Sequence, residues 1–225
     1  MNALSIIVPV LDEAAGLEAC LAPLQPMRAR GVEVIVVDGG SRDTTRSLAV
    51  PLADLVLQDA RGRARQMNAG ANAAHGKTFA FLHADTILPA QADLAIARAV
   101  ESGARWGRFD VTIEGRPWVL KVVACMMNGR SRWTGIATGD QAIFVERNAF
   151  AAAGGFPVIP LMEDIAMSKR LKASAGRPAC LRTRVTTSGR RFEARGPWRT
   201  IFVMWRLRLA YALGADPASL VRHYR

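Results

Sequence analysis

Short runs of apolar, largely β-branched residues alternate with helix-like segments through the first half of the chain. The runs lie at residues 4–10, 32–38, 53–58 and 78–83, and the helical segments at 13–29, at 62–76 and from Pro89 to about Val100. Apolar runs this short are typical of strands covered on both faces. Their alternation with helices favours right-handed parallel crossovers. We therefore predict an α/β fold with a doubly wound, mostly parallel central sheet.

Acidic residues follow three of these strands. Asp38 ends the second strand, Asp12 comes just after the first, and Asp85 stands in FLHADT just past the fourth. The carboxyl ends of parallel strands meet at one edge of a sheet, and open α/β sheets bind their ligands there. We expect the binding site at this edge.

The second half of the chain has a less regular pattern. Strands are predicted at 105–115, 140–146 and 179–191, the first alternating like an exposed strand and the last leading into a basic loop. Helices are predicted at 117–129, 160–176 and 197–214, with a short one ending near Gly154. The last helix is apolar on most of its surface, so it either packs on the core or lies in a membrane interface.

Size, charge and cysteines narrow the class of protein. The 225 residues fit one domain, or one domain with an appendage. Residues 1–112 carry a net charge of −1 and residues 113–225 a net charge of +12. The basic half indicates a phosphate-bearing partner, unless it is only a solvated arginine-rich face. The three cysteines are scattered, which argues against a zinc site or disulfide framework and favours a cytoplasmic protein.

The turn after the first strand excludes two common nucleotide sites. It reads PVLDEA, without the glycines that a dinucleotide-binding turn requires, and no GxxxxGK[ST] loop occurs in the chain. A metal ion together with arginines could neutralise phosphates in place of a glycine-rich loop. The apolar stretch at the N-terminus is short and has no basic region before it, so we expect a first strand there and not a secretory signal, and no apolar run is long enough to predict a membrane-spanning helix.

Six segments resemble those of family 2 glycosyltransferases with the GT-A fold. In order they are SIIVPVLDEA, VVDGGSRDTT, GRARQMNAGANAAHG, FLHADT, GDQAIFVER with GGFP, and MEDIAMSKRLK, within residues 4–173. The segments SGRRF and LGADPASLVRHYR are similar to those of a small bacterial subgroup of unassigned substrate. We expect a GT-A domain over 1–190, with a nucleotide-binding half (1–112) and an acceptor half (113–190), and a basic, amphipathic extension over 191–225.

The resemblance implies a nucleoside-diphosphate sugar donor, with UDP and GDP equally admissible. Asp38 matches the residue that contacts the nucleoside, with Asp12 and Glu13 beside it; otherwise Asp38 only caps a turn and Asp12 only caps a helix. Arg63 matches a diphosphate contact, since a guanidinium fork suits phosphate oxygens, or it is a solvated arginine. Pro9 and Asn68 complete the expected nucleotide site.

A divalent cation, Mn²⁺ or Mg²⁺, is implied by the same resemblance. Family members carry Asp-x-Asp after the fourth strand, and Asp85 matches the last Asp, which binds the metal. His83 stands in place of the first Asp. It is either a further ligand or only a polar end to the strand. One carboxylate together with substrate phosphates can hold such an ion.

The resemblance also implies a catalytic base and an inverting reaction. Asp164 matches the base that deprotonates the acceptor hydroxyl, with Glu163 orienting nearby groups; alternatively, both acids only suit a helix N-terminus. Arg190 and Arg191 contact the diphosphate or an anionic acceptor, or form a basic loop. Asp140 is a candidate for the acceptor pocket.

Two other functions remain open from the residues alone. A nucleotidyltransferase would normally show a glycine-rich loop after the first strand, which PVLDEA lacks. A non-catalytic basic module that binds membrane or nucleic acid would not need three acids at one sheet edge, and the basic half shows no nucleic-acid motif. We expect a cytoplasmic enzyme without a nucleic-acid partner. A lipid-linked acceptor and peripheral contact with the inner face of the membrane both remain open.

Overall fold

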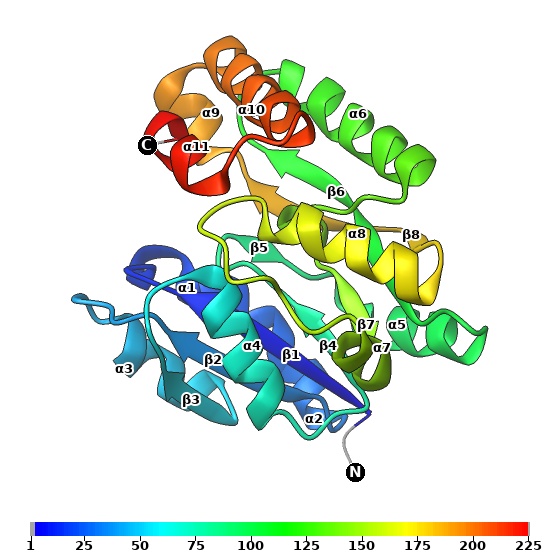
Figure 1. Cartoon of the computed structure of the whole chain (residues 1–225). Coiled ribbons are helices and arrows are strands. Elements are labelled where there is room, and N and C mark those ends of the chain that lie inside the picture. Colours follow the sequence, from blue (N-terminus) through cyan, green and yellow to red (C-terminus); the bar gives the residue numbers. More distant parts are fainter. Residues whose placement is uncertain (1–2, 225) are drawn as a thin grey trace.

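The computed structural model describes the backbone of residues 3–224 and the side chains of residues 3–221. An eight-stranded mixed sheet in the order β3-β2-β1-β4-β7-β6-β8-β5 forms its centre. The strands are β1 Leu4–Val10, β2 Glu33–Asp38, β3 Leu55–Gln58, β4 Thr78–Phe81, β5 Thr86–Ile87, β6 Trp106–Glu114, β7 Phe144–Glu146 and β8 Ala179–Ser188. Helices lie on both faces of this sheet (Figure 1). The predicted α/β class is therefore correct.

Eleven α-helices lie within the described residues. They are α1 Ala14–Leu21, α2 Gln25–Ala29, α3 Thr45–Ala49, α4 Arg63–Ala73, α5 Ala92–Glu101, α6 Val119–Thr134, α7 Arg147–Ala152, α8 Glu163–Ala175, α9 Arg190–Arg195, α10 Pro197–Ala212 and α11 Pro217–Tyr224. No helix in this part of the chain is both long and apolar enough to cross a bilayer.

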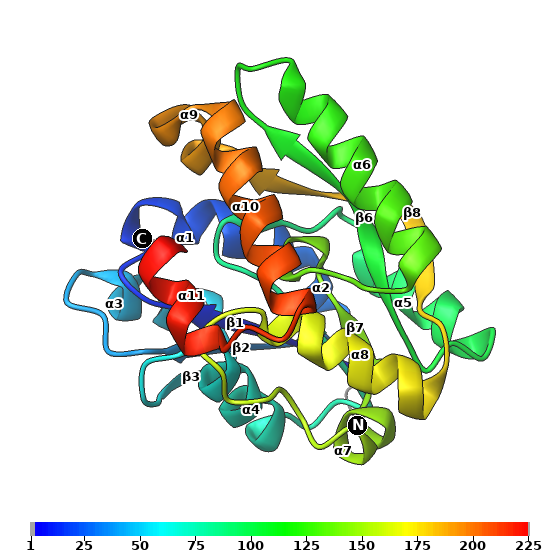
Figure 2. The same ribbon diagram turned by 45° about the horizontal axis from the view of Figure 1, so that its top comes forward.

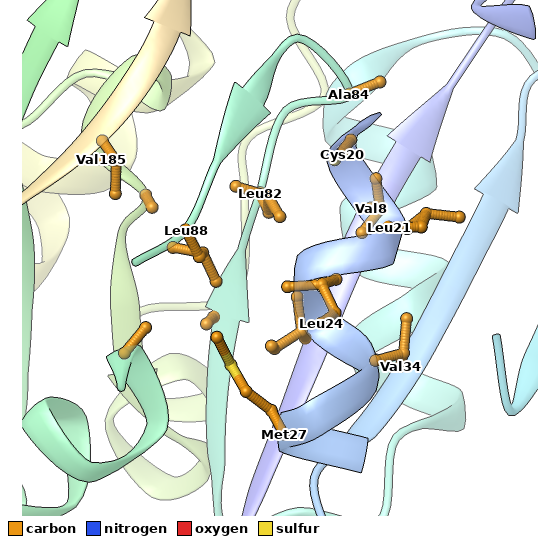
Figure 3. Close-up of a cluster of buried hydrophobic side chains, with 14 of the residues drawn as sticks. Val8, Cys20, Leu21, Leu24, Met27, Val34, Leu82, Ala84, Leu88 and Val185 are labelled. Atoms are coloured by element: carbon orange, nitrogen blue, oxygen red, sulfur yellow. The ribbon is translucent and has the colours of Figure 1, made fainter. Parts of the chain in front are cut away.

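The first half of the sheet is parallel and doubly wound. Strand β1 pairs in parallel with β2 and β4, and β2 pairs in parallel with β3. Side chains of β1 alternate between two cores, so Val8 packs with helices α1 and α2 while Ile7 packs with α4. Leu21 and Leu24 lie beside Val8 on the first of these faces (Figure 3). The parallel register places the ends of β1, β2 and β4 at one edge of the sheet.

The second half of the sheet is mixed. Strand β7 is antiparallel to both β4 and β6, whereas β6 runs parallel to β8 and β5 is antiparallel to β8. The prediction that residues 105–115 form an exposed strand is wrong, because β6 lies between β7 and β8 and Trp106 and Phe109 are fully buried.

Several predicted boundaries also need correction. The helix expected over 13–29 is split by a 3₁₀ turn at Ala22–Leu24, which contains Pro23, and Pro26 follows in the first turn of α2. The helix expected to stop at Gly76 ends at Ala73. The expected basic loop at 190–191 is the first turn of α9, and α10 is followed by α11.

Helix α10 lies beside α6 and packs on the segment that enters α8 (Figures 1 and 2). Leu207 of α10 and Leu220 of α11 form a small buried cluster with Leu161, Met162 and Ile165. Residues after 190 therefore contribute to the packing around the start of α8.

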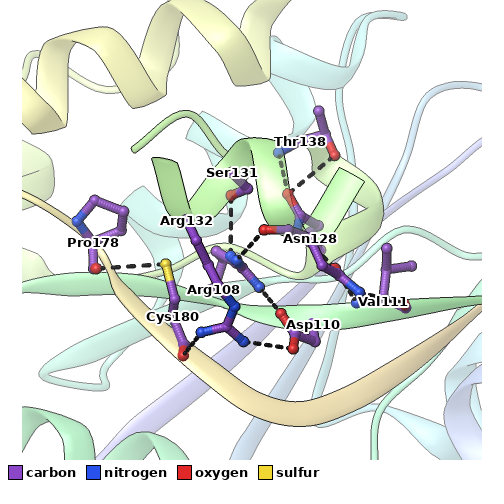
Figure 4. A network of polar contacts seen from close by, with 10 residues as sticks. Arg108, Asp110, Val111, Asn128, Ser131, Arg132, Thr138, Pro178 and Cys180 are labelled. Atoms are coloured by element: carbon purple, nitrogen blue, oxygen red, sulfur yellow. Dashed lines mark hydrogen bonds and ion pairs between the residues drawn. The ribbon is translucent and has the colours of Figure 1, made fainter. Parts of the chain in front are cut away.

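A buried polar network fastens α6 to β6 (Figure 4). The Asn128 side chain exchanges hydrogen bonds with the backbone of Val111, and Arg108 donates to Ser131 Oγ at 3.0 Å. Asp110 accepts from Arg108 and, at 2.6 Å, from Arg132. Because each buried charge in this network has a partner, the network holds α6 firmly against the sheet.

Candidate metal and transfer site

Three side chains from two chain segments converge at the carboxyl edge of the sheet. His83 and Asp85 follow β4, and Asp140 comes from a 3₁₀ turn, Gly139–Gln141, that precedes β7. One ligand atom of each lies within 4.8 Å of those of the other two. His83 Nδ1 lies 3.5 Å from Asp140 Oδ1. An imidazole with two carboxylates is a donor set that fits Mn²⁺, and one carboxylate with waters and phosphates would suffice for Mg²⁺.

Gly139 makes room for the His83 ring. A Cβ atom at position 139 would lie 2.0 Å from His83 Cε1, a distance that no real pair of carbon atoms adopts. The turn is held by a capping box between Thr138 and Gln141, and Gln141 Nε2 also donates to Asn128 Oδ1 at 3.4 Å. The polar network around α6 thus supports the segment that carries Asp140.

Charges around Asp140 favour its ionised form. Desolvation by the surrounding protein opposes ionisation, but the hydrogen bond and charge of His83, with the charges of Arg63 and Arg191, outweigh it and lower the pKa of Asp140. A carboxylate that stays ionised is suited to binding a cation. Arg63 and Arg191, predicted to contact phosphates, therefore both lie close enough to act on this centre.

Asp164 lies at the first turn of α8, next to the same turn. Its Oδ2 accepts from the Gly139 N–H at 2.9 Å and its Oδ1 from the Ile165 N–H at 2.7 Å. The Cα atom of Gly139 therefore packs against the His83 ring, and the Gly139 N–H donates to Asp164. The predicted base and the metal-ligand candidates form one connected site.

Glu163, beside Asp164, is buried. Desolvation, and then the charge of Asp164, raise the pKa of Glu163. The charges of Arg63 and His83 oppose this rise. The preceding residue, Met162, has φ 67°, a left-handed conformation that is costly for a residue with a side chain. Asp12 and Ala142 are the other non-glycine residues with positive φ in the described chain, and both also lie at this edge. Backbone strain of this kind gathers at functional sites.

A hydrogen-bonded chain joins the ends of β1 and β2. Asp38 is buried and accepts from both the N–H and the Oγ of Ser41. Ser41 Oγ in turn accepts from the Asp12 N–H at 2.9 Å, and Asp12 Oδ1 accepts from the Arg42 N–H at 2.8 Å. The expected alternative of Asp12 as a helix cap is wrong, because its carboxylate contacts the β2–α3 loop.

The start of α1 is capped by side chains from that same loop and from the first residue of α3. Asp43 Oδ2 accepts from the Ala14 N–H at 3.1 Å, and Thr45 Oγ1 accepts from the Glu13 N–H at 2.8 Å. The Glu13 carboxylate is left to pair with Arg190 at 3.4 Å. Arg190, 177 residues from Glu13 in the sequence, therefore reaches the carboxyl edge of the sheet, while Pro9 lies buried within β1, opposite Val37.

Asn68 has a structural partner. Its Nδ2 donates to the Phe156 carbonyl at 2.8 Å and its Oδ1 accepts from the Phe156 N–H at 2.9 Å, so the amide holds the loop that precedes α8. Gln66, which sequence reasoning missed, donates from Nε2 to the carbonyls of Val10 and Val37 at 2.7 Å each. It ties β1 to β2 at the carboxyl edge of the sheet. Its place in the GRARQMN segment is the only sequence signal that could have indicated this role.

Comparison with known proteins gives one family. The model of glycosyl transferase family 2 matches residues 5–119. A search of curated proteins gave no match. Many solved structures are similar, and at the identities found they show the fold alone.

Three of these structures illustrate the likeness. S. aureus TarS 1–349 in complex with UDP has a TM-score of 0.67 at 18% identity, over 84% of this chain and 60% of that one. The mannosyltransferase PcManGT from Pyrobaculum calidifontis, with GDP-Man and Mn²⁺, gives 0.65 at 21%, over 99% and 68%. Glucosyl-3-phosphoglycerate synthase from Mycobacterium tuberculosis, with Mn²⁺, UDP and glucosyl-3-phosphoglycerate, gives 0.67 at 16%, over 94% and 79%. The match to TarS 1–349 thus spans less than two thirds of the length of that protein.

Proposed function

Because this chain belongs to glycosyl transferase family 2, we propose that it transfers a sugar from a nucleoside-diphosphate donor to an acceptor hydroxyl, with inversion at the anomeric carbon. One observation carries the proposal. Asp164 is hydrogen-bonded to Gly139, the residue that packs against His83 and precedes Asp140. A candidate base and a candidate metal site therefore lie side by side, as a direct displacement requires.

The donor lies along the ends of β1, β2 and β4 in this proposal. Asp38 and Asp12 face the nucleoside, and Arg63 and Arg191 face the diphosphate, whose charge their guanidinium groups offset. His83, Asp85 and Asp140 would hold a divalent cation, which supplies Lewis-acid stabilisation of the leaving diphosphate when it is bound. Complexes of PcManGT with GDP-Man and Mn²⁺, and of TarS with UDP, support both the donor class and the choice of UDP and GDP as probes.

Asp164 removes the acceptor proton in this mechanism. The two backbone N–H groups that bind its oxygens fix the direction of the carboxylate. Glu163, the neighbouring residue, is buried and orients nearby groups. Attack of the freed hydroxyl oxygen at the anomeric carbon then breaks the bond to the nucleoside diphosphate on the opposite side.

A peripheral contact with membrane is the second part of the proposal. Trp198, Phe202, Trp205 and Leu209 form an exposed stripe along α10. A second exposed stripe on the neighbouring α6 consists of Trp118, Val122, Met126 and Trp133. Four of the five tryptophans of the chain are thus exposed on two adjacent helices, whereas soluble surfaces rarely group large apolar side chains in this way.

Basic side chains border these stripes and suit anionic lipid head groups. Arg195, Arg199 and Arg206 are exposed around α10, and Lys121 is exposed on α6. A cytoplasmic enzyme at the inner face of the membrane, acting on a lipid-linked acceptor, would use such a surface. Nucleic acid remains an unexpected partner, since the aromatic side chains lie on helices without a nucleic-acid-binding motif.

Calorimetric titration with UDP and with GDP, each with and without Mn²⁺, tests the donor site. We expect saturable binding of one nucleotide that requires the metal and is lost in Asp85→Ala, because the cation links the carboxylate to the diphosphate. Glu18→Ala, an exposed acid of α1, is the matched control and should bind as the wild type does. Binding that is unchanged in Asp85→Ala would contradict the metal assignment.

A further inference from the structure

Two partly buried arginines near the proposed base carry buried nitrogens that lack hydrogen-bond partners. Nε and Nη2 of Arg130 on α6, and Nε of Arg208 on α10, are buried without an acceptor in the part of the chain that the structure describes. Among the described residues that are not exposed, these three atoms are the buried side-chain nitrogens or oxygens without a hydrogen-bond partner. Buried donors in folded proteins are nearly always satisfied, and those of a charged group are the most costly to leave unpaired.

Neighbouring arginines show that the fold can satisfy such groups. Arg108, which is fully buried, donates to Asp110, to Ser131 Oγ and to the Asn128 carbonyl. Arg132, two residues after Arg130 on the same helix, binds Asp110 and the Cys180 carbonyl (Figure 4). The lack of partners at Arg130 is thus not a general property of the arginines of α6.

The two unpartnered groups also repel each other. Burial, and then the charge of Arg208, lower the pKa of Arg130 to about 10, so its guanidinium remains charged at neutral pH. Two like charges held together out of water destabilise the fold unless an anion joins them. The structure therefore has a place for negative charge between α6 and α10.

Asp164 is near this place but does not fill it. Its charge is among those that act on Arg130, yet it forms no ion pair with either arginine within the described residues. Its two oxygens accept from Gly139 and Ile165 instead. Arg63 and Arg191 act instead on the metal-ligand candidate Asp140. Asp164 is therefore hydrogen-bonded to the turn that carries Asp140, while its charge also acts on Arg130.

We propose that Arg130 and Arg208 bind a phosphate group carried by the acceptor, which places the acceptor hydroxyl beside Asp164. The inference rests on the proposed transfer reaction and specifies its acceptor class. Phosphate offers oxygens on several sides, so it can accept from two guanidinium groups that approach from different helices. The group belongs either to a water-soluble phosphomonoester or to a lipid head group at the exposed stripes of α6 and α10.

Titration with inorganic phosphate tests the site directly. The protein is first saturated with Mn²⁺ and UDP or GDP, so that the donor site is filled, and phosphate binding is then followed by calorimetry. We expect Arg130→Gln and Arg208→Gln each to weaken phosphate binding about tenfold or more, as the loss of a charge-assisted hydrogen bond would. Arg98→Gln, an exposed arginine of α5 outside both stripes, should bind phosphate as the wild type does.

Thermal unfolding separates a ligand site from a structural role. Without phosphate, Arg130→Gln should melt at a higher temperature than the wild type, because it removes an unpaired buried charge. Phosphate should raise the melting temperature of the wild type and leave that of Arg130→Gln unchanged. Arg132→Gln, whose side chain is paired, should lower the melting temperature. Equal phosphate affinity in the wild type and Arg130→Gln, or a lower melting temperature of Arg130→Gln, would overturn the inference.

Nucleotide titration of the same samples keeps the two proposals distinguishable. Nucleotide binding without Arg130-dependent phosphate binding defeats the inference alone, whereas failure to bind either nucleotide defeats the proposed function. Vesicles then identify the source of the phosphate. A lipid source predicts that Arg130→Gln loses affinity for phosphatidic acid vesicles but keeps it for phosphatidylglycerol vesicles. A soluble source predicts equal vesicle binding by both proteins, together with the loss of inorganic phosphate binding in Arg130→Gln.

Discussion

Two backbone N–H groups hold the Asp164 carboxylate. We expect this side chain to act in turnover and not in donor binding. We expect Asp164→Asn to lower kcat by roughly 10²–10⁴-fold, because an amide cannot accept the acceptor proton. Nucleotide affinity should stay within about twofold of the wild type, since the site for the diphosphate lies around Asp85 and Arg63. Release of the nucleoside diphosphate from the donor, measured beside calorimetry, checks both values. Turnover retained by Asp164→Asn would refute the role.

Gly139 offers a second test at the residue scale. Gly139→Ala should weaken Mn²⁺ binding in the presence of nucleotide, because the added Cβ would force the His83 ring away from Asp140. Gly129→Ala on the exposed side of α6 is the matched control, since a Cβ there meets nothing within 4 Å. The control should raise stability by about 0.5–1 kcal/mol, as alanine does in place of a helical glycine. Unaltered Mn²⁺ affinity in Gly139→Ala would show that His83 is not a ligand.

At the scale of elements, the exposed stripes on α6 and α10 predict binding to anionic membranes. The double variant Trp198→Ser, Trp205→Ser should lose most of its co-flotation with vesicles that contain phosphatidylglycerol, because it removes the two largest apolar side chains of the α10 stripe. Val158→Ser, an exposed apolar side chain outside both stripes, should float as the wild type does. If the intact protein does not float with these vesicles at low salt, the membrane contact is excluded.

For the molecule as a whole, acid should weaken the packing of α2 against α5. Asp93 forms a two-pronged pair with Arg30, with distances of 2.7 and 2.8 Å, and this hydrogen bonding lowers the pKa of Asp93 against the smaller opposing effect of burial. A carboxyl whose pKa is lowered on folding contributes stability above its unfolded value, near pH 4. That stability is lost as the pH falls through the folded value.

Asp93→Asn should therefore melt at a lower temperature at pH 7 and show a shallower fall in melting temperature below about pH 4. Glu18→Gln, at an exposed acid of α1, serves as the control and should follow the wild-type profile. Parallel melting profiles of the wild type and Asp93→Asn over this range would contradict the assignment.

The positions of the first four strands could be predicted because each depends on a local run of apolar residues. The ends of the same runs show which acidic residues follow the strands. Parallel pairing then brings those strand ends to one edge of the sheet. The family resemblance pointed to Asp85 and Asp164, which indeed lie in one site. The buried state of β6 was missed because exposure depends on the strands beside it, and its alternating pattern does not reveal them.

The sequence by itself therefore determined the fold class, the family and the sheet edge at which the acidic residues gather, since these follow from local periodicity and from motifs that occur in order. Only the tertiary structure decided which side chains meet. It brought Asp140 to His83 and Asn68 to Phe156, 88 residues away, and it left Nε and Nη2 of Arg130 and Nε of Arg208 without an acceptor among the described residues. Contacts between distant segments depend on how layers pack and which donors remain unpaired, and no local pattern of residues encodes that outcome.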